Sequence, residues 1–254
     1  MSGDGYAPAE LMAVVMARAF RDGEVVVMGA VPALPLAACL LARRRHAPNL
    51  WSIVGGSGTV NPEPEALPAS SCDPALARAP SALPLTEVVL LEGRGDALDV
   101  FCAGGLQIDA HGNCNLICVG PWDRPTLRGP GTVGLPFLPA VRRSVLYTMN
   151  HTPRTFVERV DFVSGPGHPA GPGEGPSEGE GPSLVVTPLA VMDFDPMSRR
   201  MRLASVHPGV EVEEVRRATG FELPGPDPVP VTPPPTGEEL AELRRIDPTG
   251  VLRG

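Results

Sequence analysis

The segment EVVVMGAVPALPLAACLLARRRHAPNLWSIVGGSG, residues 24–58, decides the fold class of this chain. It opens with a short apolar run that ends in glycine, residues 24–30, and closes with a similar run, residues 50–58. The stretch between them, residues 34–48, is apolar and carries Arg43 to Arg45 at its C-terminal end, where cations suit the dipole of a helix. A strand, a helix and a second strand with short links predict parallel βαβ winding.

Helices are also predicted at both ends of the chain. Residues 8–23 repeat apolar side chains at helical spacing, and Gly23 is a suitable stop. Residues 210–221 are predicted to form a helix that ends at Gly220. Thr236 and Glu239 have the spacing of a capping box, which predicts that a last helix begins there.

The middle of the chain is predicted to be rich in strands. Residues 84–93, PLTEVVLLEG, fit either a strand or the start of a helix, and the pattern does not decide between them. The turn AHGN predicts a hairpin between residues 98–109 and 113–120. Further strands are predicted at 142–150 and 155–165, and a second hairpin joins 184–195 to 201–206 through DPMSRR.

Length and composition are those of a globular protein. The chain has 254 residues, of which 43% are hydrophobic, enough for a substantial core, and we expect a single domain over residues 1–254. The exception is residues 165–183, a run of Gly, Pro, Glu and Ser that cannot bury enough apolar surface to order itself. We therefore predict a disordered surface loop at 165–183.

Several classes of function are disfavoured by composition. The net charge of −8 makes nonspecific nucleic-acid binding a poor expectation. All 21 basic residues are Arg, which removes Schiff-base lysines and P-loop nucleotide sites. No apolar run approaches the roughly 20 residues of a membrane span, and the N-terminus does not resemble a signal peptide. Five cysteines without CxxC spacing predict a reducing, cytoplasmic compartment and no metal site.

Glycines stand where predicted strands end, and this is the first sign of a ligand site. Gly29, the run Gly55 to Gly58, and Gly104 with Gly105 follow three such strands, and a fourth cluster surrounds Gly131. The turn or helix after a parallel strand exposes backbone N–H groups that can hold a ligand. None of the clusters matches GxGxxG, so a dinucleotide site is not indicated. The alternative is that these glycines serve only close turns.

A series of motifs follows in one order along the chain. They are GGLQIDAHGNCN (104–115), RGPGTVGLP (128–136), HTPRTFVERVDFVSGPG (151–167), LVVTPLAVMDFDPMSRRMRLASVHPGV (184–210), ATGF (218–221) and LRRIDPTGVLR (243–253). This order resembles the B (β) subunit of the family I CoA-transferases, glutaconate CoA-transferase in particular. The resemblance implies a three-layer open α/β fold, with a mostly parallel sheet, helices on both faces and β-hairpins in the second half. It also implies an α subunit as partner, an active site at the subunit interface, and an acyl-CoA substrate whose CoA is not a bound cofactor.

One position departs from the family pattern. In transferases of this family, a glutamate of this subunit follows the strand that here reads LWSIV, and it attacks the thioester. The corresponding residue here is Gly55 or Gly56, which has no side chain to act as nucleophile. Glu63, Glu65 or Ser57 could substitute, but prolines flank the two glutamates and no base lies near Ser57 in sequence. A carboxylate of the α subunit is the favoured alternative, and a non-catalytic scaffold role stays open.

These observations favour particular chemistry and particular binding residues. Related branches of the family hydrolyse C–C bonds or decarboxylate CoA thioesters, and both reactions need enolate stabilisation without an acyl-enzyme relay. We therefore expect C–C hydrolysis with ring opening, or decarboxylation, more than thiol transfer. The residues expected to hold the thioester or the CoA arm are Gly104, Gly105, Gln107, Arg128, Gly131 and Arg143, with Arg124 and Arg142 as further phosphate candidates. His151, His207 and the cysteines are expected to be structural.

Overall fold

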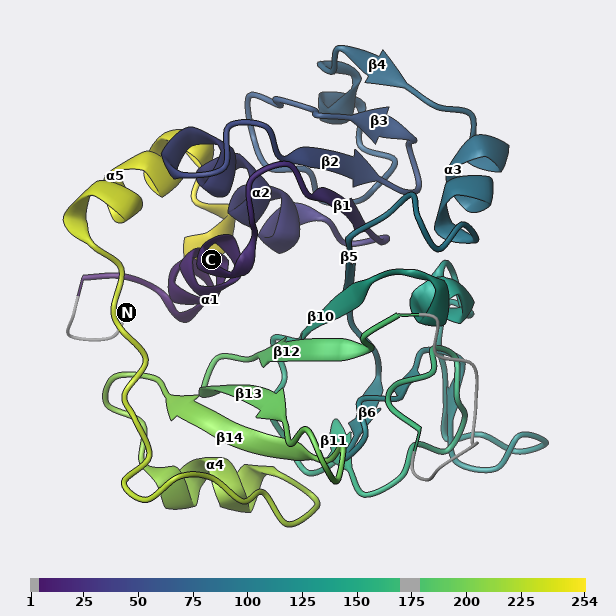
Figure 1. The fold of residues 1–254 in the computed structure, drawn as a ribbon, viewed down its shortest axis with the longest axis vertical. Helices are drawn as coiled ribbons and strands as arrows, with labels where there is room; N and C mark the ends of the chain where they lie inside the picture. Colours follow the sequence, from purple (N-terminus) through teal and green to yellow (C-terminus); the bar gives the residue numbers. More distant parts are fainter. Residues whose placement is uncertain (1–4, 170–178) are drawn as a thin grey trace. The chain divides into compact units, whose positions relative to one another are not determined.

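The computed structural model describes residues 5–169 and 179–254, which form two compact units. The first unit contains residues up to Cys102 together with Pro234–Gly254, and the second contains Ala103–Pro233. Figure 1 shows the helices and strands of both. Among the residues that the structure describes, no helix has the length and apolar character that a membrane crossing requires.

The first unit is built on the predicted βαβ segment. β1 (Val25–Met28) pairs in parallel with β2 (Trp51–Val54) on one side and with β5 (Val100–Ala103) on the other. α2 (Ala33–Arg45) connects β1 to β2, as predicted. The short strands β3 (Thr59–Val60) and β4 (Ser81–Ala82) add antiparallel pairs beyond β2. The parallel pairing of β1 and β2 confirms the α/β class.

Helices from both ends of the chain pack together in this unit. α1 (Pro8–Ala19) and α5 (Gly237–Ile246) both contact α2, and all three are seen together in Figure 1. The capping box of α5 is confirmed, since Glu239 N donates to Thr236 Oγ1 at 3.2 Å and Thr236 N donates to Glu239 Oε2 at 2.7 Å. The undecided segment 84–93 contains α3 (Leu85–Glu92), and two 3₁₀ turns lie at Pro74–Ala77 and Val251–Arg253.

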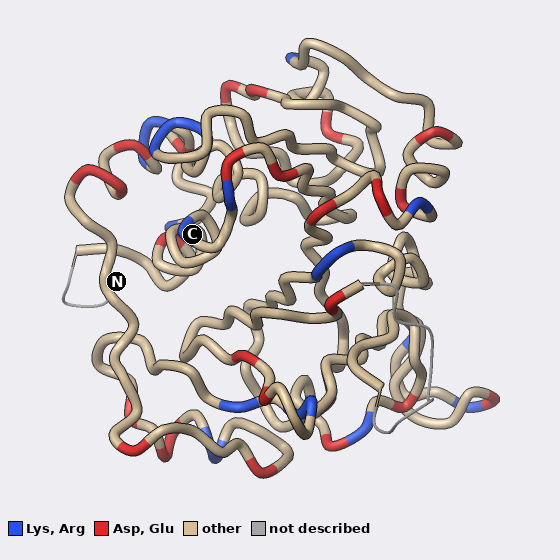
Figure 2. The backbone as a smooth tube through the Cα atoms, in the orientation of Figure 1, with Lys and Arg blue, Asp and Glu red and all other residues tan. Residues whose placement is uncertain are grey.

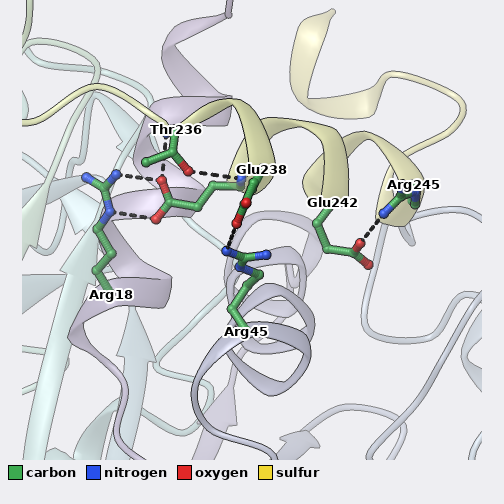
Figure 3. Close-up of polar contacts among 7 residues, drawn as sticks. Arg18, Arg45, Thr236, Glu238, Glu242 and Arg245 are labelled. Atoms are coloured by element: carbon green, nitrogen blue, oxygen red, sulfur yellow. Dashed lines mark hydrogen bonds and ion pairs between the residues drawn. The ribbon is translucent and has the colours of Figure 1, made fainter.

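Ion pairs attach α5 to the neighbouring helices. Glu239 accepts from the Arg18 guanidinium of α1 at 2.6 Å, and Glu242 accepts from Arg44 of α2 at 3.0 Å. Arg45 pairs with Glu238, so two of the three arginines at the end of α2 form ion pairs with α5. Figure 2 shows the basic and acidic residues side by side around α5, and Figure 3 shows the contacts of Arg18 and Arg45.

The second unit contains the hairpins. β10 (Arg143–Tyr147) pairs in parallel with β12 (Pro182–Val186), which continues antiparallel into β13 (Ala190–Phe194) and β14 (Met201–Val206). A smaller sheet joins β11 (Phe156–Val157), β6 (Gln107–Asp109) and β7 (Cys114–Asn115), and β8 (Cys118–Val119) pairs with β9 (Leu127–Arg128). α4 (Val212–Ala218) and a 3₁₀ helix, Leu135–Ala140, complete the unit.

Three sequence predictions are corrected here. The hairpin around AHGN is confirmed, but its first arm is only β6, because β5 pairs with β1 instead. The strand predicted over 155–165 is reduced to Phe156–Val157, and the rest of that segment is irregular apart from a single bridge at Gly165. At both ends of the predicted loop 165–183 the chain is held: Cys114 N donates to Gly165 O at 2.8 Å, and β12 begins at Pro182. Residues 170–178 of that loop lie outside the described residues.

Candidate functional site

The carboxyl ends of β1 and β2 bring two glycine turns together. Gly29 directly follows β1 and Gly55 directly follows β2, and the two strands are parallel neighbours. Gly55 N donates to Met28 O at 2.9 Å, which continues the strand pairing into the turns. Ser71 reaches the same edge, because its N donates to Ala30 O at 2.9 Å. This is the edge at which open α/β sheets bind ligands.

Gly56 is required by close packing. A Cβ at this position would stand 2.1 Å from Ser71 Oγ and 2.7 Å from Ser71 Cβ, so any side chain would displace Ser71. Gly55 is less restricted, because a Cβ there would stand 3.2 Å from Met28 O. Its other near neighbour is Glu92 Oε1, at 3.5 Å. The pair of glycines therefore has one member fixed by packing and one that faces a carboxyl group.

Glu92 is the last residue of α3, and its side chain is buried. Only 5% of the residue is exposed, and within residues 5–169 and 179–254 its carboxyl group makes no hydrogen bond or ion pair. Burial raises the pKa of Glu92 to about 7. A carboxyl group with such a pKa exchanges protons readily near neutral pH. The sequence prediction missed this residue.

The sequence suggested three residues that could replace the missing glutamate, and the structure places them in different surroundings. The Ser57 hydroxyl contacts Thr59 Oγ1 at 2.8 Å and Val54 O at 3.4 Å, and neither group is a base that could activate it. Glu63 pairs with Arg43 at 3.4 Å, and Glu65 pairs with Arg78 at 3.1 Å.

The two glutamate side chains are 54% and 86% exposed, respectively. Both carboxylates therefore lie in surface ion pairs, and reaching Gly55 would require these pairs to break.

Gly104 and Gly105 belong to the second unit, where backbone packs closely against them. A Cβ on Gly104 would lie 2.7 Å from Tyr147 O. A Cβ on Gly105 would lie 2.8 Å from Asn115 O and 2.9 Å from Gln107 O. These distances are below normal contact, so this packing by itself accounts for glycine at both positions.

Gln107 is buried in a network of hydrogen bonds. Its Nε2 donates to Asp161 Oδ2 at 3.0 Å, and its Oε1 accepts from Asn115 Nδ2 at 2.7 Å and from Asp161 N at 3.1 Å. Asp161 also accepts from Gly120 N at 2.9 Å. The amide is therefore occupied within the chain. Asp109 plays a similar part in the AHGN turn, where it accepts from the backbone N of His111 and Asn113, each at 3.0 Å.

The arginines proposed for CoA differ in accessibility. Arg128 is exposed, donates to Trp122 O at 2.9 Å, and holds its guanidinium 4.9 Å from the centre of the Trp122 ring. Arg124 and Arg142 are less buried than Arg143, which lies buried at the start of β10. Gly131 adopts a φ of 109°, which only glycine tolerates without strain, and it stands in open space.

The histidines and most cysteines occupy structural positions. His151 contacts Thr187 Oγ1 at 2.8 Å and Thr219 Oγ1 at 3.0 Å, and burial lowers its pKa to about 4. His207 contacts Thr187 O at 2.8 Å. Cys102, Cys114 and Cys118 are buried, and burial raises the pKa of Cys114 to about 12. A thiolate nucleophile is therefore disfavoured at Cys114.

Comparison with known proteins identifies the family. The family model of coenzyme A transferases matches residues 9–218. The chain belongs to the coenzyme A transferase family. The B subunit of 3-oxoadipate CoA-transferase from Pseudomonas knackmussii is 32% identical over 246 residues, which cover 95% of this chain and 94% of that protein.

Relatives with different activities are similarly close. The cholesterol ring-cleaving hydrolase IpdB subunit of Mycobacterium tuberculosis is 32% identical over 244 residues, covering 94% of both chains. The crystal structure of glutaconate coenzyme A-transferase from Acidaminococcus fermentans superposes with a TM-score of 0.87 at 29% identity and covers 98% of both chains. The family and the B-subunit resemblance predicted from sequence are thereby confirmed. Transferases and a hydrolase share this fold, so the activity depends on individual residues.

In this member of the coenzyme A transferase family, the structure brings together only part of the predicted site. Gly55, Gly56 and Ser57 lie at the carboxyl edge of the first unit, where Glu92 joins them from α3. Glu63 and Glu65 lie in surface ion pairs. A helical interpretation of residues 84–93 would have placed Glu92 on the same helix face as Val88, four residues earlier, but only the structure shows that this face is buried.

Proposed function

We propose that this chain is the β subunit of a heteromeric enzyme that cleaves an acyl-CoA by adding water across a C–C bond, and does not transfer the thiol. The observation that carries the proposal is the glycine pair at the end of β2. Gly55 and Gly56 offer no carboxylate for a glutamyl-CoA intermediate, and Ser71 occupies the space of a side chain at position 56. The hydrolase relative from Mycobacterium tuberculosis supports the same direction.

The chemistry requires stabilisation of negative charge rather than a covalent relay. When water adds to a ketone β to the thioester and the C–C bond breaks, the electron pair passes to the thioester as an enolate. Backbone N–H groups in a glycine turn can donate to such an oxyanion. In the turn after β2, Gly55 N and Gly58 N already donate to Met28 O and Val54 O, so we propose that Gly56 N and Ser57 N supply these donors. We also propose that an A subunit completes the active site. The B-subunit naming of the 3-oxoadipate relative supports the inference of an A partner.

The test is a product analysis of the complex co-purified with its A subunit. The probe is 3-oxoadipyl-CoA, because a relative is named for that acid. C–C hydrolysis gives succinate and acetyl-CoA, whereas transfer to added propionate gives propionyl-CoA and 3-oxoadipate. We expect the first pair of products with or without propionate. Formation of propionyl-CoA, with an intermediate on this chain trapped by hydroxylamine or borohydride, would refute the proposal.

Thiol transfer is the second candidate, because the 3-oxoadipate relative is named a CoA-transferase. It requires Glu63 or Glu65 to leave its ion pair with Arg43 or Arg78. Changing each glutamate to Gln separates the candidates. Loss of propionyl-CoA formation in a folded variant would support transfer, and unchanged cleavage in both variants supports hydrolysis. If this chain is only a non-catalytic scaffold for the A subunit, neither glutamate change should alter the products that the complex forms.

We also propose that Arg128 binds a CoA phosphate. The exposed guanidinium over Trp122 supports this role, since Arg presents a planar fork of donors that suits phosphate oxygens. Isothermal titration of the complex with CoA measures it. Arg128→Gln should weaken binding by about tenfold or more, because a hydrogen bond to a charged group contributes roughly 1.5 kcal/mol. Arg94→Gln, at an exposed arginine paired with Asp96, serves as control. If the two variants bind CoA with equal affinity, Arg128 does not contact CoA.

A further inference from the structure

A buried carboxyl group lies beside the glycine turn, and it comes from a different element than the strand. Glu92 closes α3, where Val88 and Glu92 are the buried residues and Leu85, Val89 and Leu90 are exposed. The helix therefore directs the carboxyl group into the unit. Its Oε1 lies 3.5 Å from the point where a Cβ on residue 55 would stand. Any side chain at position 55 would thus extend toward the carboxyl group.

The surroundings of Glu92 differ from those of a structural buried glutamate. Glu10 is equally buried, but its carboxylate accepts from Arg244 Nε at 3.0 Å and from Ala7 N at 2.8 Å. Glu92 has no such partner within the described residues. Burying a carboxyl group without a partner is unfavourable, and such groups are concentrated at functional sites. Packing alone does not explain why this position is glutamate rather than an apolar residue.

The glycine at position 55 leaves the group accessible. Gly55 is half-buried and Gly56 is exposed, so the turn reaches the surface. Because residue 55 is glycine, it places no side chain between a ligand on this turn and the Glu92 carboxyl group, whose Oε1 lies 3.5 Å from the position of the missing Cβ. The same turn is the one that we propose to stabilise the oxyanion. A proton-transferring group and candidate donors would then lie at one place.

We propose that Glu92 is a catalytic residue. It acts as the general base that activates water for attack on a 3-oxoacyl-CoA bound at the glycine turn after β2. The inference rests on the proposed function. The Glu92 carboxylate removes a proton from water, and the water oxygen bonds to the ketone carbon. The bond between that carbon and the α-carbon then breaks, and its electron pair goes to the α-carbon as the thioester enolate. The proton held by Glu92 passes to this carbon, which leaves a carboxylic acid and the shortened acyl-CoA.

The raised pKa of Glu92 fits this role. A base works best when its pKa lies near the operating pH, and burial brings the pKa of Glu92 to about 7. A stronger base than an ordinary glutamate can accept the proton of water and still return it to carbon. We therefore expect kcat to rise with pH and to level off above about 7.

The test compares variants of the complex on 3-oxoadipyl-CoA, measuring succinate and acetyl-CoA. Glu92→Gln should lower kcat by about 10²- to 10⁴-fold, the usual contribution of a general base. KM should change little, and the rise with pH should disappear. Glu92→Asp keeps the carboxylate but shortens its reach, and should retain part of the activity. Glu87→Gln, at an exposed residue of the same helix, should behave as wild type.

Failure of this inference and failure of the proposed function give different results. If the wild-type complex forms succinate and acetyl-CoA but Glu92→Gln has a kcat within threefold of it, Glu92 is not the base and the proposed function stands. If the wild-type complex forms propionyl-CoA from propionate, the proposed function is wrong. A glutamyl-CoA adduct trapped on Glu92 itself would make the residue a nucleophile, which contradicts both proposals. A wild-type complex that neither cleaves nor transfers also contradicts both.

Discussion

Replacing Glu92 with glutamine should stabilise this chain at alkaline pH and leave its stability almost unchanged at acidic pH. Burial raises the pKa of Glu92 from 4.5 to about 7 in the folded chain. Between these two values the folded state holds a proton that the unfolded state has released. The free energy of unfolding therefore falls as pH rises through this window, and the full loss is present above pH 7. Glutamine has nearly the same shape as the protonated acid and does not ionise.

The magnitude follows from the size of the pKa difference. Each pKa unit corresponds to about 1.4 kcal/mol, so the ceiling is about 3 kcal/mol. The carboxyl group lies beside a turn that reaches the surface, and water at that turn lowers the expectation to about 2 kcal/mol. At pH 4.5 the same difference should be a few tenths of a kcal/mol or about zero, since most of the window lies above it.

Urea unfolding of the full chain at pH 4.5 and pH 8.5 measures both values. Glu92→Gln is compared with wild type and with Glu87→Gln, the exposed control on α3. Other carboxylates titrate equally in all three proteins and cancel in the differences. The reasoning would be refuted if the difference in the free energy of unfolding between Glu92→Gln and wild type is the same at both pH values. A variant less stable than wild type at pH 8.5 would show that Glu92 has a partner when ionised.

Three further substitutions test individual hydrogen bonds and ion pairs of the fold. Arg244→Gln leaves the Glu10 carboxylate, 2% exposed, without its guanidinium, and should lower unfolding stability by about 2 kcal/mol in urea; a change below about 0.5 kcal/mol would contradict the pairing. Thr236→Ala removes the cap of α5 and should cost about 1 kcal/mol, seen as a lower thermal midpoint; an unchanged midpoint would contradict it. Gln107→Ala leaves buried partners unpaired and should cost about 2 kcal/mol in urea; unchanged stability with weaker acyl-CoA binding would instead make Gln107 a binding residue.

The parts of the fold that were predicted correctly depend on local pattern. The βαβ segment 24–58 combines short apolar runs, glycine stops and a helix with cations at its end, and each of these signals is contained within a few residues. The capping box at Thr236 is equally local. The prediction of a strand over residues 155–165 failed because a segment rich in β-forming residues does not always pair with a neighbouring strand. Only Phe156 and Val157 form a strand, which pairs with β6, while Gly165 makes an isolated bridge to Cys114 and the residues between them are irregular.

The site was harder to predict because its contacts are long in sequence. Glu92 and Gly55 lie close together in the structure but are 37 residues apart in the sequence. In the sequence it is one of 29 acidic residues, and its burial depends on how α3 packs. Gln107 has the same difficulty, since its partner Asp161 lies 54 residues away. The motif therefore indicated where polar residues matter, but not that the amide of Gln107 is occupied within the chain.

Different constraints act at the two glycine positions at the end of β2, and this difference bears on the function. Gly56 is imposed by the fold, because a Cβ would collide with Ser71 at 2.1 Å. Gly55 is not imposed to the same degree: its nearest neighbour would be Met28 O at 3.2 Å, which a shift of a few tenths of an ångström would relieve. Packing therefore explains glycine at 56 but only weakly at 55. In the proposed mechanism, glycine at 55 serves access, since a side chain there would stand between a ligand on the turn and the Glu92 carboxyl group.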